Sequence, residues 1–133
     1  MEVQWKDRNI RLSTLVDCIS QFFAERNFTV SLKESDVNYL IVAKPKRFHE
    51  IAENIHVSVS GKPNDFTVKF VAGSHSRVLV IFGSFTAFFG GGSLSLKGLK
   101  SKEALDKIKR KFMAYLTDKI YQLADSARQV NFG

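Results

Sequence analysis

Short stretches in which apolar and polar residues alternate dominate the middle of the chain. The alternation covers 28–33, 55–60 and 66–70, and between them 39–43 is apolar on both faces. A period of two is the pattern of a half-buried β-strand. Most connections between neighbouring stretches are too short for a helical crossover, so consecutive strands must pair antiparallel. The sequence therefore predicts an antiparallel sheet, to which 3–5 and 77–82 add short strands.

Two helical patterns flank these strands. Residues 10–26 and 101–128 place apolar side chains at steps of three and four, which gives each helix one buried face. Asn9 and Ser101 are expected to cap the two helices, and Asn27 to end the first in a left-handed conformation. The prediction is a single α+β domain over 1–133. It has a curved antiparallel β-sheet of five to six strands, an N-terminal helix and a long C-terminal helix packed on one face, and a frayed tail at 129–133.

This order of elements resembles two known architectures, the helix-grip fold of START and plant-allergen type lipid carriers and the TATA-binding-protein-like fold. The resemblance lies in element order over most of the chain, and it carries over no functional residue because no family motif matches. The helix-grip fold usually has two helices after its first strand, whereas this sequence predicts one. The TATA-binding-protein-like fold is therefore favoured. The opposite sheet face is expected to be polar and to lack the phenylalanines that wedge between base steps, which disfavours DNA binding in the manner of that fold. Its residues are Thr29, Ser31, Lys33, His56, Ser58, Ser60, Thr67 and Lys69.

Positive charge is concentrated in one window. The chain has 20 Lys and Arg against 13 Asp and Glu, a net charge of +7. The window 97–111 contains two acids, Glu103 and Asp106, and seven basic residues: Lys97, Lys100, Lys102, Lys107, Lys109, Arg110 and Lys111. Such a window favours phosphate-bearing partners, either an anionic lipid surface or nucleic acid. A run of charges on the outer face of a helix is, however, usually just a solvated surface.

A stretch without any charged residue lies directly before this window. The nineteen residues 78–96, VLVIFGSFTAFFGGGSLSL, include Phe82, Phe85, Phe88 and Phe89. Nineteen residues are enough for a membrane-spanning helix. The glycines and serines between 83 and 93 break helical continuity, however, and favour a strand, an aromatic turn and a glycine loop. Because so apolar a stretch needs something other than water to contact, a ligand, a membrane or a partner is expected there.

Motifs for catalysis are missing. The sequence has no phosphate-binding loop, dinucleotide fingerprint, nucleophile elbow or HExxH pair, so we expect a protein that is not an enzyme and needs no cofactor. His49, Glu53 and His56 would share one face if 48–56 were helical, which makes them a weak candidate metal site. Because His56 alternates with the apolar residues of a strand, we expect no metal. One cysteine, Cys18, and the lack of an apolar leader favour the cytoplasm, either free or peripheral to a membrane.

Three binding functions stay open. The favoured hypothesis is binding of a hydrophobic small molecule or an anionic lipid surface through 78–96 and the adjoining basic residues. The first alternative is a homo-oligomer or protein-interaction module that buries 78–96, and the second is non-specific nucleic-acid binding. The residues expected to contact a ligand or membrane are Phe82, Phe85, Phe88, Phe89, Phe112 and Tyr115. Those expected to bind anions are Lys97, Lys100, Lys107, Lys109, Arg110 and Lys111.

Overall fold

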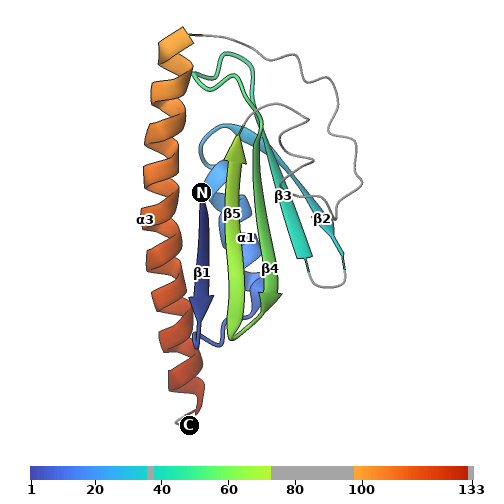
Figure 1. The fold of residues 1–133 in the computed structure, drawn as a ribbon, viewed down its shortest axis with the longest axis vertical. Coiled ribbons are helices and arrows are strands. Elements are labelled where there is room, and N and C mark those ends of the chain that lie inside the picture. Colours follow the sequence, from blue (N-terminus) through green and yellow to red (C-terminus); the bar gives the residue numbers. More distant parts are fainter. Residues whose placement is uncertain (36–37, 73–97, 132–133) are drawn as a thin grey trace.

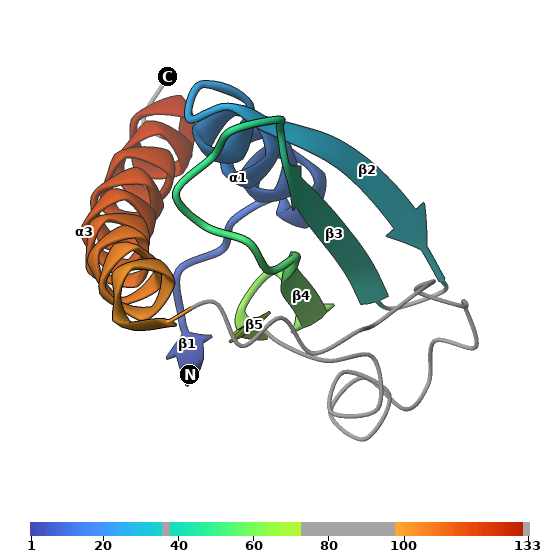
Figure 2. The ribbon, with the colours of Figure 1, turned by 90° about the horizontal axis from the view of Figure 1, so that it is seen from above.

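One antiparallel sheet with two helices on its concave side forms the structure, a computed structural model that describes residues 1–35, 38–72 and 98–131 (Figure 1). The strands are β1 (Glu2–Lys6), β2 (Phe28–Glu34), β3 (Asn38–Pro45), β4 (Ile55–Lys62) and β5 (Asp65–Ala72), and the helices are α1 (Leu12–Ala24) and α3 (Gly98–Asn131). The strand order is β1-β5-β4-β3-β2. Figure 2 shows the strands in an arc, with α1 inside the arc and α3 beside β1. The predicted α+β fold is confirmed, and the strand predicted at 77–82 lies outside the described residues.

The strands pair antiparallel, as their short connections predicted. The predicted strand at 3–5 is β1, which pairs with β5 and places the N-terminal segment at the edge of the sheet. The connection between β4 and β5 is a tight turn, because pairing continues to Lys62 and Asp65. Gly61, just before this turn, has a φ of 118°, and a Cβ there would collide with the carbonyl oxygen of Asp65. The hairpin therefore needs glycine at this position.

Both helices begin at residues other than those predicted. Arg11 precedes α1 and makes no capping hydrogen bond through its side chain, while Asn9 stands further outside the helix. α3 begins at Gly98, so Ser101 lies within the helix. Burial of an apolar face, more than a cap, decides where a helix forms in a protein. Asn27 adopts the predicted left-handed conformation, with a φ of 66°, and α3 continues to Asn131 through residues that were expected to fray.

Aromatic rings fill the space between α1, α3 and the sheet. Phe112 of α3 is fully buried, and its ring centroid lies 5.5 Å from that of Phe22, 5.6 Å from that of Phe23 and 5.3 Å from that of Phe70. These are the separations of aromatic rings in contact. This part of the interior is therefore packed by the chain's own side chains.

The sheet face turned away from the helices is buried at its centre. Leu40 and Val42 of β3 and Val71 of β5 are buried on this face, and the register places His56 and Ser58 of β4 beside them. Of the polar residues predicted on this face, His56 is 2% and Ser58 5% exposed, whereas Thr29, Ser31 and Lys33 are exposed. The alternation along each strand predicted on which face of the sheet a side chain lies, but not whether the side chain is buried there.

Candidate functional site

Basic residues line the outer side of the first half of α3. Five of them are described, four exposed and Lys109 half-buried, and they share the helix surface with the exposed acids Glu103 and Asp106. Ile108 and Phe112 belong to the buried core, so the apolar face predicted for this helix is buried and the charged residues lie on the opposite face. Lys97 and the side chain of Lys100 lie outside the part that the structure describes. The five are Lys102, Lys107, Lys109, Arg110 and Lys111.

The loop between β3 and β4, residues 46–54, brings two basic residues, Lys46 and Arg47, and two acids, Glu50 and Glu53, to the same end of the molecule. Figure 1 shows this loop beside the start of α3, at the top of the view. Ile51 of the loop belongs to the same buried cluster as Ile108 of α3, and Glu50 lines one surface hollow together with Glu103 and Lys107, so acids lie among the basic residues here. We call this surface the basic end. It consists of Lys44, Lys46, Arg47, Lys102, Lys107, Lys109, Arg110 and Lys111, of which all but Lys109 are exposed.

His49 fastens this loop to the rest of the fold. The backbone N–H of Ile51 donates a hydrogen bond to Nδ1 of His49 at 3.0 Å, and Nε2 of the same ring lies 2.9 Å from the carbonyl oxygen of Arg26. Because Nδ1 accepts, Nε2 must hold the ring proton and donate it to that oxygen. The His49 ring also packs on Phe28, with 4.5 Å between ring centroids. The imidazole therefore ties the loop to the end of α1 and the start of β2.

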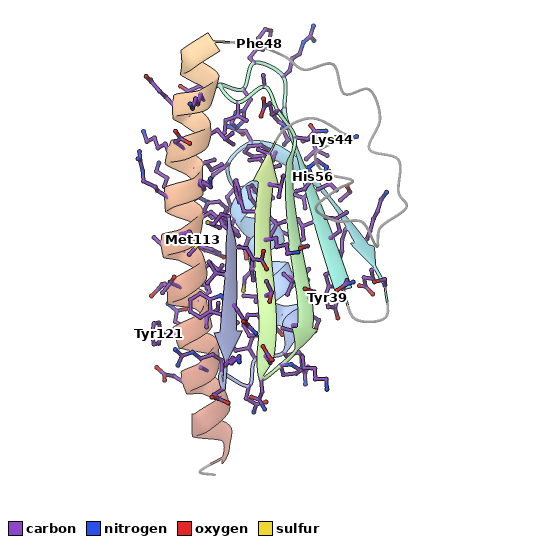
Figure 3. All side chains as sticks on the ribbon, viewed as in Figure 1. Tyr39, Lys44, Phe48, His56, Met113 and Tyr121 are labelled. Atoms are coloured by element: carbon purple, nitrogen blue, oxygen red, sulfur yellow. The ribbon has the colours of Figure 1, made fainter. Side chains whose placement is uncertain are left out.

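A tight turn at 46–49 presents one aromatic side chain to the solvent. The N–H of Lys46 donates to the carbonyl of Asn27 at 3.0 Å, and the N–H of His49 donates to the carbonyl of Lys46 at 3.1 Å, which closes the turn. Phe48 occupies the third position of this turn with a φ of 65°, and its side chain is 95% exposed. Figure 3 places it at the end of the molecule where α3 begins. The side chain of Arg47 lies over its ring, with the guanidinium carbon 5.5 Å from the centroid.

Two of the residues expected to contact a ligand lie on the inner side of α3. Phe112 is core, enclosed by rings of α1 and β5. Tyr115 is half-buried, and its hydroxyl donates a hydrogen bond of 3.1 Å to the carbonyl oxygen of Cys18. Burial, and then the neighbouring Cys18 and Glu25, raise the pKa of the Tyr115 phenol above its usual value. Both side chains join α3 to α1, and neither lies on the basic end.

The other expected contacts fall where the structure gives no description. Phe82, Phe85, Phe88 and Phe89 lie outside the described residues. Within the described ranges, no helix is long and apolar enough to cross a membrane.

The candidate metal ligands do not form a site. His56 belongs to β4 and is buried in the sheet, whereas His49 and Glu53 belong to the loop that precedes this strand. Both ring nitrogens of His49 are already engaged by the loop and by the end of α1. Among residues 1–35, 38–72 and 98–131, no three His, Cys, Asp or Glu side chains are grouped so as to hold a metal ion.

Comparison of the chain with protein-family models, with curated proteins and with solved structures finds no match. Sequence reasoning found the α3 part of the basic end but not the loop part. The run Lys44-Pro45-Lys46-Arg47-Phe48 was the available signal, since it sets three basic residues beside an aromatic one.

Proposed function

We propose that this protein binds an anionic lipid surface through the basic end, together with the uncharged segment 78–96 that precedes α3 in the sequence. The observation that supports this most directly is that basic residues from two separate parts of the chain, 44–47 and 102–111, lie toward the same end of the molecule, where the loop 46–54 is beside the start of α3 (Figure 1). Each Lys or Arg near an anionic bilayer contributes about 1 kcal/mol of attraction. A cluster of this size next to an apolar segment combines electrostatic attraction with apolar contact, as peripheral membrane proteins do.

The packing of the interior favours a surface site over an enclosed pocket. The rings of Phe22, Phe23, Phe70 and Phe112 contact one another across the space between α1, α3 and the sheet. A carrier would need that space for its hydrophobic ligand. Of the two forms of the lipid hypothesis, this packing therefore supports contact with a lipid surface more than enclosure of a single molecule.

Vesicle binding tests the proposal. The protein is mixed with vesicles of phosphatidylcholine containing phosphatidylserine, or of phosphatidylcholine alone, and sedimented. We expect retention by the anionic vesicles and its loss as salt rises. The variant Lys107→Gln, Lys109→Gln, Arg110→Gln, Lys111→Gln removes four charges, so its binding should weaken by about 4 kcal/mol, roughly a thousandfold.

A control variant with the same net charge separates the basic end from charge in general. This control variant combines Lys6→Gln, Arg11→Gln, Lys33→Gln and Lys62→Gln, which remove four exposed charges. Lys6 belongs to β1 and Arg11 directly precedes α1, while Lys33 and Lys62 lie at the ends of β2 and β4 that are distant from the basic end. This variant should keep most of the vesicle binding. Equal loss in both variants, or no binding of the unaltered protein to anionic vesicles, contradicts the proposal.

Two further measurements address the alternatives. Retention of the unaltered protein by duplex DNA but not by vesicles would favour nucleic-acid binding, whose affinity falls with salt by about 0.9 logarithmic units per phosphate contact. The variant Phe85→Ala, Phe88→Ala, Phe89→Ala should weaken vesicle binding and leave binding to DNA unchanged. If instead it dissolves a dimer without changing vesicle binding, self-association is the better account of 78–96.

A further inference from the structure

Phe48 is exposed at a position where the backbone itself disfavours phenylalanine. In the turn 46–49 the third residue has a φ of 65°, a conformation that turns of this type usually give to glycine or asparagine. A bulky side chain in this region is an outlier. The fold gains no core packing from this ring in return, because 95% of its surface faces solvent. Glycine would suit the turn better, so a requirement outside the turn's own stability explains the phenylalanine.

The turn is held in place from several directions. Lys46 and His49 are bonded to Asn27 and Arg26, at the junction between α1 and β2, and Ile51 anchors the following residues in the core. Phe48 therefore projects from a fixed support and needs little ordering on binding, which lowers the entropic cost of contact.

The surroundings of Phe48 specify the kind of partner. Lys46 and Arg47 directly precede it in the sequence, Lys44 lies near the end of β3, and the basic stretch of α3 lies toward the same end of the molecule. Arg47 has a long stem that can stay along an apolar surface while its charged group reaches phosphate oxygens. An exposed aromatic ring with a guanidinium group beside it matches a bilayer with an apolar interior and an anionic surface.

From these observations we infer that Phe48 inserts into the bilayer as an apolar anchor of the basic end. This inference rests on the proposed function and adds a second apolar contact, from the loop 46–54, to the one expected from 78–96. The ring enters the interfacial region, and Lys46 and Arg47 remain at the level of the lipid phosphates. The loop and α3 thereby orient the protein with this end toward the membrane.

The decisive variant is Phe48→Gly, because it suits the turn and removes only the ring. The expected result is a vesicle affinity lower by about tenfold or more, with a urea midpoint equal to or above that of the unaltered protein. Phe48→Leu, which keeps an apolar side chain, should retain most of the affinity. The matched control is Tyr121→Ala. Tyr121 is an exposed aromatic residue with the guanidinium carbon of Arg8 5.3 Å from its ring centroid, but it lies on α3 away from the basic end (Figure 3). Its removal should leave vesicle affinity unchanged.

A fluorescence measurement reports insertion itself. Trp5 is the only tryptophan of the chain, so the double variant Trp5→Phe, Phe48→Trp carries one reporter at the tip of the turn. Its emission should shift to shorter wavelength on addition of phosphatidylserine-containing vesicles, because the indole leaves water. The corresponding variant Trp5→Phe, Tyr121→Trp should show no such shift.

The outcomes distinguish this inference from the proposed function. If Phe48→Gly binds anionic vesicles as well as the unaltered protein does, while the four-charge variant of α3 loses binding, the anchor is refuted and the membrane function stands. If the tryptophan at position 48 keeps its water-exposed emission on bound vesicles, the anchor is refuted likewise. If the unaltered protein binds no anionic vesicle, both fail together.

Discussion

Replacing His49 by alanine tests whether one imidazole holds the loop of the basic end in place. The variant removes two hydrogen bonds, one accepted from Ile51 and one donated to Arg26, and the ring contact with Phe28. A hydrogen bond contributes about 1 kcal/mol and an aromatic pair about 0.5 to 1.5 kcal/mol. Because His49 is half-buried and water can replace part of what is lost, we expect the free energy of unfolding to fall by about 2 to 3 kcal/mol.

Two further substitutions at this position separate the two hydrogen bonds. In His49→Asn the amide oxygen can take the place of Nδ1 and accept from Ile51, and in His49→Gln the amide nitrogen can take the place of Nε2 and donate to Arg26. Each should recover about 1 kcal/mol relative to His49→Ala. The measurement is urea unfolding followed by circular dichroism, with an unchanged slope showing that only stability has changed.

Glu50→Ala serves as the control for this series. Glu50 is the next residue along the chain and is exposed, so its replacement should change stability by about 0.5 kcal/mol or less. If His49→Ala is no less stable than Glu50→Ala, the His49 imidazole does not hold the loop in place. The same conclusion follows if neither the asparagine nor the glutamine variant is more stable than the alanine variant.

Three other outcomes follow from the packing. Phe112→Ala should lower the free energy of unfolding by about 3 to 5 kcal/mol in urea, because its fully buried ring joins α3 to α1 and β5; a change below about 1 kcal/mol would contradict its place in the core. Burial raises the native pKa of Tyr115 above the unfolded value of about 10. The stabilisation that results is therefore complete below that pH and is lost as the pH rises through the native pKa, and Tyr115→Phe should show a smaller fall in stability than the unaltered protein in alkaline urea titrations. Gly61→Ala should lower the thermal midpoint, since the left-handed backbone costs about 1 to 2 kcal/mol and the added Cβ meets the carbonyl of Asp65; an unchanged midpoint would show that the hairpin can rearrange.

Much of the fold could be predicted because it depends on local periodicity. The apolar positions of α1 and α3 at helical spacing, and the alternation in β2, β4 and β5, are present in the sequence whatever the rest of the chain does. Short connections then required antiparallel pairing. Helix ends were predicted less well, since Asn9 and Ser101 are suitable caps by residue type but the start of each helix depends on packing against other elements.

Coverage of the sheet's second face could not be predicted from alternation. The residues that join that face were identified correctly by their parity, yet His56 and Ser58 are buried on it and not exposed. Burial is a property of what lies above a side chain in space, and a period of two contains no information about that.

For the basic end, the sequence by itself determined which residues of α3 are basic and which of them lie on the same side of the helix. Residues three and four apart on a helix share one side regardless of context. The tertiary structure alone decided that the loop 46–54 meets this helix, and that Phe48 points into solvent while Phe112 points into the core. Both are phenylalanines next to basic residues in the sequence. They differ in their long-range contacts. Residues of α1 and β5 pack on the ring of Phe112, whereas Phe48 lies in a turn that His49 holds at the surface.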